Sequence, residues 1–307
     1  MTVAFLGHKM SRTRFRENIA GWLLASPWLI GFVLFTAGPM VVSLVLSLTK
    51  WEIITPPQFV GLDNYVKLAA DPLVGQSLKV TTIYAAVSVP LYLVLGLFLA
   101  LMLNQRVPGI AFWRTIYYIP SVISGVGVSI LWMWVFNRDF GILNFILWKL
   151  FGIQGPGWLS TQEWALPSII IMSLWSVGGS MVLNLAGLQG IPTELYEAAR
   201  IDGANSFHQL RYITIPMLSP VLFFTLVMGI IGALQAFTPA YVMTSGGPNN
   251  ATLFLMLYLY SNAFEWLKMG YASALAWLLF VYIMLMTLLV IRSSSAWVFY
   301  QGELKGR

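Results

Sequence analysis

Residues 80–103 read VTTIYAAVSVPLYLVLGLFLALML, a run without a single charged side chain. About 20 consecutive apolar residues are enough for a helix to cross the hydrocarbon core of a bilayer. The chain has five further runs of this kind, which lie at 19–49, 115–136, 165–187, 217–239 and 271–291. We therefore predict an all-α integral membrane protein with six transmembrane helices.

The composition agrees with a membrane location. Of the 307 residues, 58% are hydrophobic and 9% are charged, whereas a soluble domain carries about 25% charged residues. The chain has no cysteine, which excludes disulfides and thiolate metal sites. The formal charge of +6 comes from basic residues beside the apolar runs. This placement is typical of membrane orientation and argues against a nucleic-acid partner.

The basic residues also predict the orientation. With the N-terminus in the cytoplasm, eleven lysines and arginines lie on the inside and six on the outside, as the positive-inside rule requires. Six spans then place both termini in the cytoplasm, in the inner (plasma) membrane. We predict a cytoplasmic segment over 1–18, a transmembrane domain over 19–292 and a cytoplasmic tail over 293–307. The first span is read as an uncleaved helix with bends at Pro27 and Pro39.

One outer segment is apolar but too short to cross the membrane. Residues 141–151 favour a helix that lies in the membrane interface. Trp158 and Trp164 would then belong to the aromatic belt at the same interface.

The six spans contain no Asp, Glu, Lys, Arg or His. Transporters driven by ion gradients usually place such groups within the membrane, because these groups carry the coupling ion. The energy for transport must therefore enter elsewhere, or the protein is a passive channel or a scaffold subunit. The chain has no phosphate-binding loop, catalytic constellation or metal-ligand cluster, so we predict that it is not an enzyme, with no catalytic residue and no metal.

The loop between the fourth and fifth spans, residues 190–216, contains the most specific pattern in the chain. It is expected to form two short helices. Thr193 is positioned to cap the first helix, and Gly203 to end it in a left-handed conformation. Ser206 and Gln209 fit a capping box for the second helix, and Pro216 marks the end of that helix or the entry to the next span.

The first of these loop helices has a face of small residues. Leu195, Ala198 and Ala199 share that face at helical spacing. Such a face suits insertion into a groove on a partner protein, with Tyr196 and Arg200 against its walls. The alternative is an amphipathic helix that lies on the membrane surface.

Glu197-Ala198-Ala199, then Gly203, then Ile213-Thr214-Ile215-Pro216 resembles the EAA motif of ABC importer permeases. One departure is Ile215 where the family has leucine. The surrounding residues 196–204 are similar to carbohydrate importers of the maltose and multiple-sugar type. The resemblance extends to Tyr118-Ile119-Pro120, to residues 244–248 and to residues 300–303, and so covers most of the chain.

The resemblance implies a type I ABC importer permease fold and a set of partners. Two permease subunits form the pathway, two cytoplasmic ATPases bind ATP and magnesium, and an extracytoplasmic solute-binding protein delivers the cargo. This chain itself would bind no cofactor. Its ATPase-coupling residues would lie in the EAA loop: Tyr196, Glu197, Ala198, Ala199, Arg200, Asp202 and Gly203.

The cargo is expected to be a neutral sugar or oligosaccharide, because the uncharged polar side chains of the spans can bond to hydroxyls. The pathway candidates are Ser173, Trp175, Ser176 and Gln235, with Asn184 and Thr225 as weaker ones. These residues could instead make bonds between helices. The same machinery could also import glycerol-3-phosphate or a related polyol phosphate, and the permease pair could be a heterodimer or a homodimer.

Overall fold

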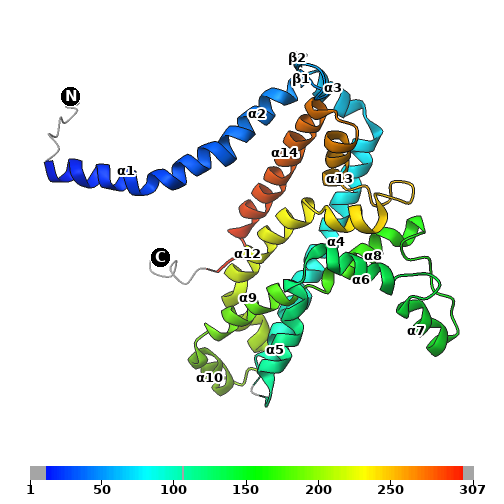
Figure 1. The fold of residues 1–307 in the computed structure, drawn as a ribbon. Helices are drawn as coiled ribbons and strands as arrows, with labels where there is room; N and C mark the ends of the chain where they lie inside the picture. The colour runs from blue at the N-terminus through cyan, green and yellow to red at the C-terminus, as the bar shows by residue number, and fades with distance from the viewer. Residues whose placement is uncertain (1–11, 106, 300–307) are drawn as a thin grey trace.

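The computed structural model describes residues 12–105 and 107–299, and these residues are mostly helical (Figure 1). The α-helices are α1 (Arg12–Phe32), α2 (Gly38–Ser47), α3 (Asp63–Ala70), α4 (Pro72–Leu103), α5 (Ile110–Tyr118), α6 (Gly125–Val135), α7 (Ile142–Phe151), α8 (Gln162–Leu174), α9 (Gly178–Gln189), α10 (Thr193–Ile201), α11 (Ser206–Gln209), α12 (Ile215–Leu234), α13 (Leu255–Tyr260) and α14 (Met269–Ser294). Shorter turns are η1 (Val33–Ala37), η2 (Ile119–Val122), η3 (Leu210–Thr214), η4 (Ala240–Thr244) and η5 (Ser261–Glu265). One small antiparallel hairpin pairs β1 (Thr49–Lys50) with β2 (Gln58–Phe59).

The bundle has two structurally different ends. The hairpin end carries β1, β2, α3 and α13, and the loop end carries α10 and the start of α5 (Figure 1). Helix α14 starts at the hairpin end and α12 starts near the loop end (Figure 1), and α4 packs against α9 and α12. The closest approach is at Gly96 of α4, where an added Cβ would lie 2.3 Å from the Ser180 hydroxyl of α9. Small residues let membrane helices pack this closely.

Within the described residues, four helices are long and apolar enough to cross a membrane, and two bent helix pairs raise the number to six. The four are 18–47, 72–103, 206–234 and 269–294. They coincide with the first, second, fifth and sixth predicted spans. The bent pairs coincide with the third and fourth.

The third predicted span, 115–136, differs from a single helix. The chain bends by 100° between η2 and α6, at Ile123 and Ser124, which have extended backbone. Pro120 lies in the η2 turn before the break, and Gly125 and Gly127 follow it. Proline and glycine disfavour a continuous helix, so this segment is a broken helix.

The fourth predicted span is also bent, by 43° between α8 and α9. The Ser176 hydroxyl donates to the Ser173 carbonyl at 3.1 Å, and two glycines follow. Gly178 lies so close to α5 that an added Cβ would be 2.3 Å from the Tyr117 carbonyl oxygen. The bend therefore lets the start of α9 contact α5.

The N-terminal helix leaves the bundle. In Figure 1 α1 extends away from every other helix, and α2 returns to α14. The π-turn η1 stands before Pro39, and Gly38 donates its N–H to Val33 across that turn. Proline removes a helical donor and its ring displaces a carbonyl, so this irregular turn lies where a Pro39 bend was predicted. Pro27 lies inside α1 without ending it.

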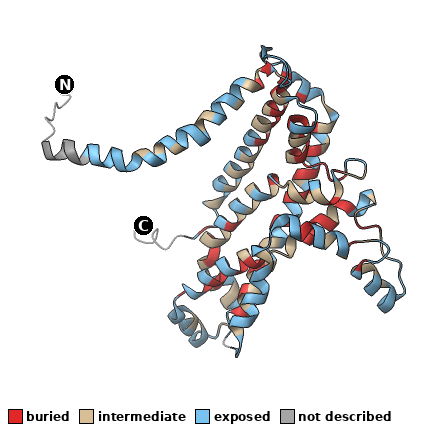
Figure 2. Cartoon of the chain, viewed as in Figure 1, coloured by how far each residue is buried: buried red, intermediate tan, exposed pale blue. Residues whose placement is uncertain are grey.

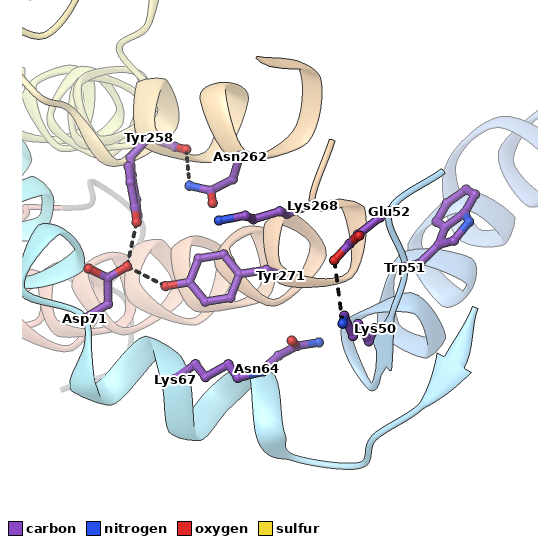
Figure 3. Close-up of a pocket in the computed structure, with 10 residues that line it drawn as sticks. All are labelled: Lys50, Trp51, Glu52, Asn64, Lys67, Asp71, Tyr258, Asn262, Lys268 and Tyr271. Atoms are coloured by element: carbon purple, nitrogen blue, oxygen red, sulfur yellow. Dashed lines mark hydrogen bonds and ion pairs between the residues drawn. The ribbon is translucent and has the colours of Figure 1, made fainter. Parts of the chain in front are cut away.

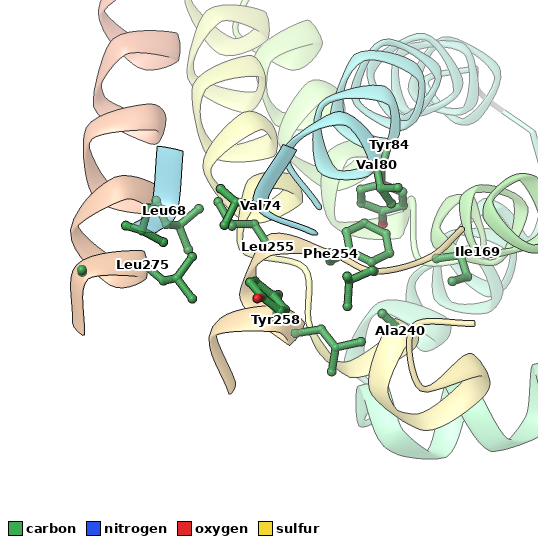
Figure 4. Packing of buried hydrophobic residues seen from close by; sticks show 14 of the residues in the cluster. Leu68, Val74, Val80, Tyr84, Ile169, Ala240, Phe254, Leu255, Tyr258 and Leu275 are labelled. Atoms are coloured by element: carbon green, nitrogen blue, oxygen red, sulfur yellow. The ribbon is translucent and has the colours of Figure 1, made fainter. Parts of the chain in front are cut away.

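Buried side chains are concentrated along α4, α8, α9 and α13 (Figure 2). The largest buried cluster holds the hairpin end together (Figure 4). There Tyr84 meets Phe254 edge to face, with ring centroids 5.0 Å apart. A second cluster, at the loop end, joins α4, α9 and α12. These clusters fix the helices that carry the two candidate sites.

The predicted interfacial helix corresponds to α7, which has no buried residue. The prediction for Trp158 is wrong, because this side chain is a core residue and not a belt residue. Trp158 is 9% exposed, packs on Phe136 and donates from its indole N–H to Asn144 at 2.7 Å. Trp164 is half exposed beside it.

Candidate functional site

Two features of the described residues can serve transport: the loop at the loop end and a cavity inside the bundle. The loop connects α9 to α12 through α10 and α11, and Figure 1 shows α10 set at the extremity of the molecule. Its helix α10 is short, and no residue of α10 is buried.

The end of α10 is a Schellman motif, in which two N–H groups bond back to the last turn. The Ala204 N–H donates to the Ala199 carbonyl at 2.8 Å, and the Gly203 N–H donates to the Arg200 carbonyl at 3.1 Å. Gly203 has φ +81°, which glycine adopts at little cost. The prediction of a left-handed stop at Gly203 is confirmed.

The predicted caps of both loop helices are wrong. Thr193 is the first residue of α10, and Pro192 is its N-cap without a side-chain bond. The N-cap of α11 is Asn205, whose side-chain oxygen accepts the His208 N–H at 2.9 Å. Gln209 donates instead to the Ala204 carbonyl at 3.1 Å. Asparagine is as good a cap as serine, and it stands one residue earlier.

The second predicted loop helix is continuous with the fifth span. Helix α11 passes through the π-turn η3 into α12, so residues 206–234 form one helix. Pro216 lies in the first turn of α12. The start of α11 therefore belongs to the same helix as the fifth span.

One side chain anchors α10 to the bundle. The Tyr196 hydroxyl lies 3.0 Å from the Thr214 hydroxyl, and its ring packs against the loop-end cluster. Tyr196 thus faces its own bundle and not the wall of a partner groove. Its position suits holding α10 in place.

The opposite face of α10 is open. Glu197, Ala198, Arg200 and Asp202 are exposed and Ala199 is half-buried. Four large apolar side chains of the loop are exposed as well, by 41% to 87% of their surface: Leu195, Ile201, Phe207 and Tyr212. His208 stacks on Tyr212 with centroids 6.1 Å apart. Exposed apolar patches of this kind mark protein contact sites. We call this surface the loop patch.

The second feature is a cavity of about 410 Å³ between α4, α8, α9 and α12. Its lining has hydroxyl groups and small residues and no charged side chain: Tyr84, Ser88, Val89, Tyr92, Ser173, Ser176, Gly179, Ser180, Leu183, Phe224, Thr225, Met228, Gly229, Gly232 and Ala233. Such a site can bond to the hydroxyls of a neutral ligand without charge pairing.

The structure brings together only part of the predicted pathway set. Ser173, Ser176 and Thr225 line the cavity. Trp175 turns toward a different cluster, where its ring meets Trp132 edge to face at 6.1 Å. Gln235 is exposed at the end of α12. Asn184 is fully buried and donates to Ser180 at 3.2 Å.

Sequence reasoning missed the α4 wall of this cavity. Tyr84, Ser88 and Tyr92 are four residues apart and therefore share one face of α4. Tyr84 and Ser88 line the cavity together with Ser173. This polar stripe within an apolar span was the signal that could have found them. The described residues contain no cluster of metal-ligating side chains.

Known proteins match this chain closely. Residues 92–297 match the family model of the binding-protein-dependent transport system inner membrane component. The chain is 43% identical over 299 residues to the probable ABC transporter permease protein YesP of Bacillus subtilis (strain 168), with 96% of each chain covered. It is 35% identical over 286 residues to the trehalose/maltose transport system permease protein MalF of Thermococcus litoralis, covering 92% of this chain and 96% of the relative.

A solved structure shares the fold. A chain of the bacterial alginate ABC transporter, solved in complex with an alginate pentasaccharide-bound periplasmic protein, superposes with a TM-score of 0.82 and 22% identity. The match covers 92% of this chain and 96% of the other. The type I importer permease fold that the sequence predicts is thereby confirmed.

Proposed function

Because this chain belongs to the family of binding-protein-dependent transport system inner membrane components, we propose that its cargo is a neutral sugar or oligosaccharide. The chain is a permease subunit of an ABC importer, a transporter subunit and not an enzyme. A relative named for trehalose and maltose transport supports the choice of a sugar.

The observation that carries the sugar proposal is the chemistry of the cavity. Its lining offers serine, threonine and tyrosine hydroxyls and two tyrosine rings, with no charged group. Hydroxyl groups can donate to and accept from the hydroxyls of a sugar. A phosphorylated polyol would bring a charge into this cavity, and none of the described residues that line it is a cation that could pair with that charge. The lining therefore favours the neutral sugar over the polyol phosphate.

The loop patch and α10 are proposed to couple this chain to one of the two ATPase subunits of the complex, which bind ATP and magnesium. Glu197, Ala198, Ala199, Arg200 and Asp202 would contact the ATPase, with Gly203 setting the turn. Exposure of this small-residue face and of the apolar side chains around it supports the assignment. Continuity of α11 with α12 offers a route from this contact to the cavity.

The remaining partners are a second homologous permease subunit, membrane lipid and an extracytoplasmic solute-binding protein. The N-terminal span supports contact with a second permease or with lipid, because its most apolar 18-residue stretch has no residue buried within the chain. We propose that the loop end and both termini face the cytoplasm. The distribution of basic residues supports this orientation.

Reconstitution tests the proposal directly. Vesicles that contain the complete complex are expected to accumulate radiolabelled disaccharide against its gradient only with ATP inside and binding protein outside. Omitting the ATPase subunits should abolish uphill uptake while leaving the permease pair inserted. Uphill accumulation without them would contradict the coupling proposal. Uptake of glycerol-3-phosphate in preference to any sugar would contradict the cargo.

A further inference from the structure

A second pocket, of about 400 Å³, lies at the hairpin end and has no role in the mechanism above. Its walls come from β1, α3, α13, η5 and the start of α14 (Figure 3). It shares no residue with the cavity between α4, α8, α9 and α12. Its floor is polar and buried or half-buried, and its rim is charged and exposed.

The floor is a closed hydrogen-bond network centred on Asp71. One carboxylate oxygen accepts from the Tyr258 hydroxyl at 2.5 Å and from the Tyr271 hydroxyl at 2.7 Å. The other accepts the Leu73 N–H at 2.9 Å. Both oxygens are thus occupied by uncharged donors. Asp71 consequently forms no ion pair with the lysines of the rim.

The rim carries three lysines, of which Lys268 makes no ion pair within 4 Å among the described residues, although its charge acts on the Asp71 carboxylate of the floor. Lys67 pairs with Asp63 at 2.6 Å, and Lys50 lies 3.8 Å from Glu52. No acidic side chain of the described residues lies within 4 Å of the Lys268 amine, which stands 5.6 Å from the Trp266 ring centre. Figure 3 shows Lys268 extending over the floor beside Asn262.

The backbone holds both sides of the rim in unusual conformations. Ile53, next to Glu52, has φ +63°, and Leu267, next to Lys268, has φ +57°. Large non-glycine side chains seldom adopt this left-handed region. Such conformations persist only where the surrounding structure imposes them, and they are concentrated at binding sites.

We propose that this pocket is a docking socket for an acidic side chain, an Asp or Glu of the solute-binding protein. The carboxylate bonds to the Lys268 amine, and Lys50 contributes a second positive charge from the opposite rim. The proposal rests on the proposed function, which places the hairpin end outside the cell. It adds a contact residue and a charge type that the family assignment does not supply.

A protein side chain suits this pocket better than the cargo does. The pocket opens at the hairpin end, between α3, α13 and α14, whereas the hydroxyl-lined cavity lies between α4, α8, α9 and α12. The exposed lysine rim can attract an acidic surface and select its register.

The test measures binding of the purified cognate binding protein to the complete transporter in nanodiscs. The wild-type dissociation constant is expected to rise with salt, since exposed charges are screened. Lys268→Gln should weaken binding by about tenfold, the effect of losing one partly buried charge pair. Lys268→Arg should bind within about threefold of wild type, because it keeps the charge. Lys149→Gln, on α7 and outside the pocket, is the matched control.

Charge exchange sharpens the result. Lys268→Glu should bind still more weakly, and one Asp or Glu to Lys exchange on the binding protein should restore its affinity. Unchanged affinity of Lys268→Gln at low salt would overturn the proposal. A second result would also overturn the proposal: an anionic trisaccharide binds to the complex without binding protein, and Lys268→Gln abolishes this binding. The pocket would then be a cargo site. A wild-type complex that the binding protein does not stimulate would instead contradict the proposed function.

Discussion

The two ends of this bundle are built in opposite ways. At the hairpin end, polar side chains tie separate segments together within the chain. The buried Asn64 amide donates to the carbonyls of Ser47 and Thr49 at 2.8 and 2.9 Å, and Asp71 joins α4 to α13 and α14. Gly270 packs so closely on Thr49 that an added Cβ would lie 1.9 Å from its carbonyl oxygen.

At the loop end, far fewer contacts hold α10 to the bundle. One hydroxyl pair, between Tyr196 and Thr214, and the ring of Tyr196 connect it to the bundle. Apart from the half-buried Ala199, the other residues of α10 and the loop patch are exposed. A region with few buried contacts opens at a lower free energy than a closely packed one. The difference indicates that the chain completes its hairpin end by itself and leaves its loop end for a partner to complete.

The largest effect is expected from Gly203→Asp. At φ +81° a side chain costs about 1–2 kcal/mol, and the added carboxylate lies beside Asp202. We expect sugar uptake to fall more than tenfold, with ATP hydrolysis no longer responding to the binding protein. Vesicle uptake and ATPase rates measure this.

Gly152→Asp is a matched control for that variant. Gly152 ends α7, has φ +66°, and like Gly203 has no atom within 4 Å of its built Cβ. It lies outside the loop, so its variant should carry the same local strain and still transport. An equal loss of sugar uptake in Gly152→Asp and Gly203→Asp would mean that backbone strain, and not loss of coupling, explains the effect of Gly203→Asp.

A smaller effect is expected at the anchor of α10. Tyr196→Ala removes both the ring contact and the hydroxyl bond and should lower uptake several-fold. Tyr196→Phe removes the hydroxyl pair alone, about 0.5–1.5 kcal/mol, and should lower uptake about twofold. Thr214→Val also removes the bond from Thr214 to the Gln209 carbonyl at 3.3 Å and should lower uptake at least as much. The double variant should be no worse than Thr214→Val. Additive losses in this cycle would show that the two hydroxyls act separately.

At the hairpin end, Asp71→Asn should weaken stability and spare coupling. The phenols of Tyr258 and Tyr271 would lose a charged acceptor, a bond worth about 1.5–3 kcal/mol when fully shielded and less at this half-buried site. The apparent Tm of the complex in detergent should fall by a few degrees. Glu52→Gln, whose ion pair is long and half exposed, should leave Tm unchanged. An unchanged Tm in Asp71→Asn would show that the network does not stabilise this end.

The same carboxyl gives a pH prediction. Burial raises the pKa of Asp71, but bonds from Tyr258, Tyr271 and Leu73 and the charge of Lys268 lower it to a net value below the usual 3.8. Burial and the bond to Asp71 raise the pKa of Tyr258 to about 12. A lowered pKa stabilises the fold above pH 3.8, and this contribution is lost as the pH falls below it. The Tm difference between wild type and Asp71→Asn should therefore be constant near neutral pH and shrink in acid.

Sequence reasoning predicted the parts of this molecule that periodicity and composition determine. Apolar runs located the spans, because the bilayer sets the length of a helix. The left-handed Gly203 was predictable because only one residue type adopts that conformation cheaply. The bends at Ser124 and Gly178 were not predicted. They depend on which helix packs alongside, as the contact of Gly178 with Tyr117 illustrates.

The candidate site was predicted unevenly for the same reason. The EAA loop is continuous in sequence and could be recognised as a motif. The cavity is assembled from four helices, so hydropathy could not tell Ser173, which lines it, from Trp175, which turns into another cluster. The hairpin-end pocket draws on residues about 220 positions apart and left no local signal.

The smallest effects are expected inside the cavity, where one hydroxyl is one of several. Ser173→Ala and Tyr92→Phe should each raise the KM for sugar about two- to fivefold, the loss of one neutral hydrogen bond, with the maximal rate little changed. Ser26→Ala is a matched control, since Ser26 on α1 makes the same bond to the carbonyl three residues back, at 2.8 Å against 2.7 Å for Ser173. The KM of Ser26→Ala for sugar should be unchanged.

Gln235→Ala distinguishes the pathway predicted from the sequence from the cavity seen in the structure. Gln235 lies outside the cavity lining, so the KM for sugar should rise less in Gln235→Ala than in Ser173→Ala. A larger rise in Gln235→Ala would place the pathway nearer the end of α12.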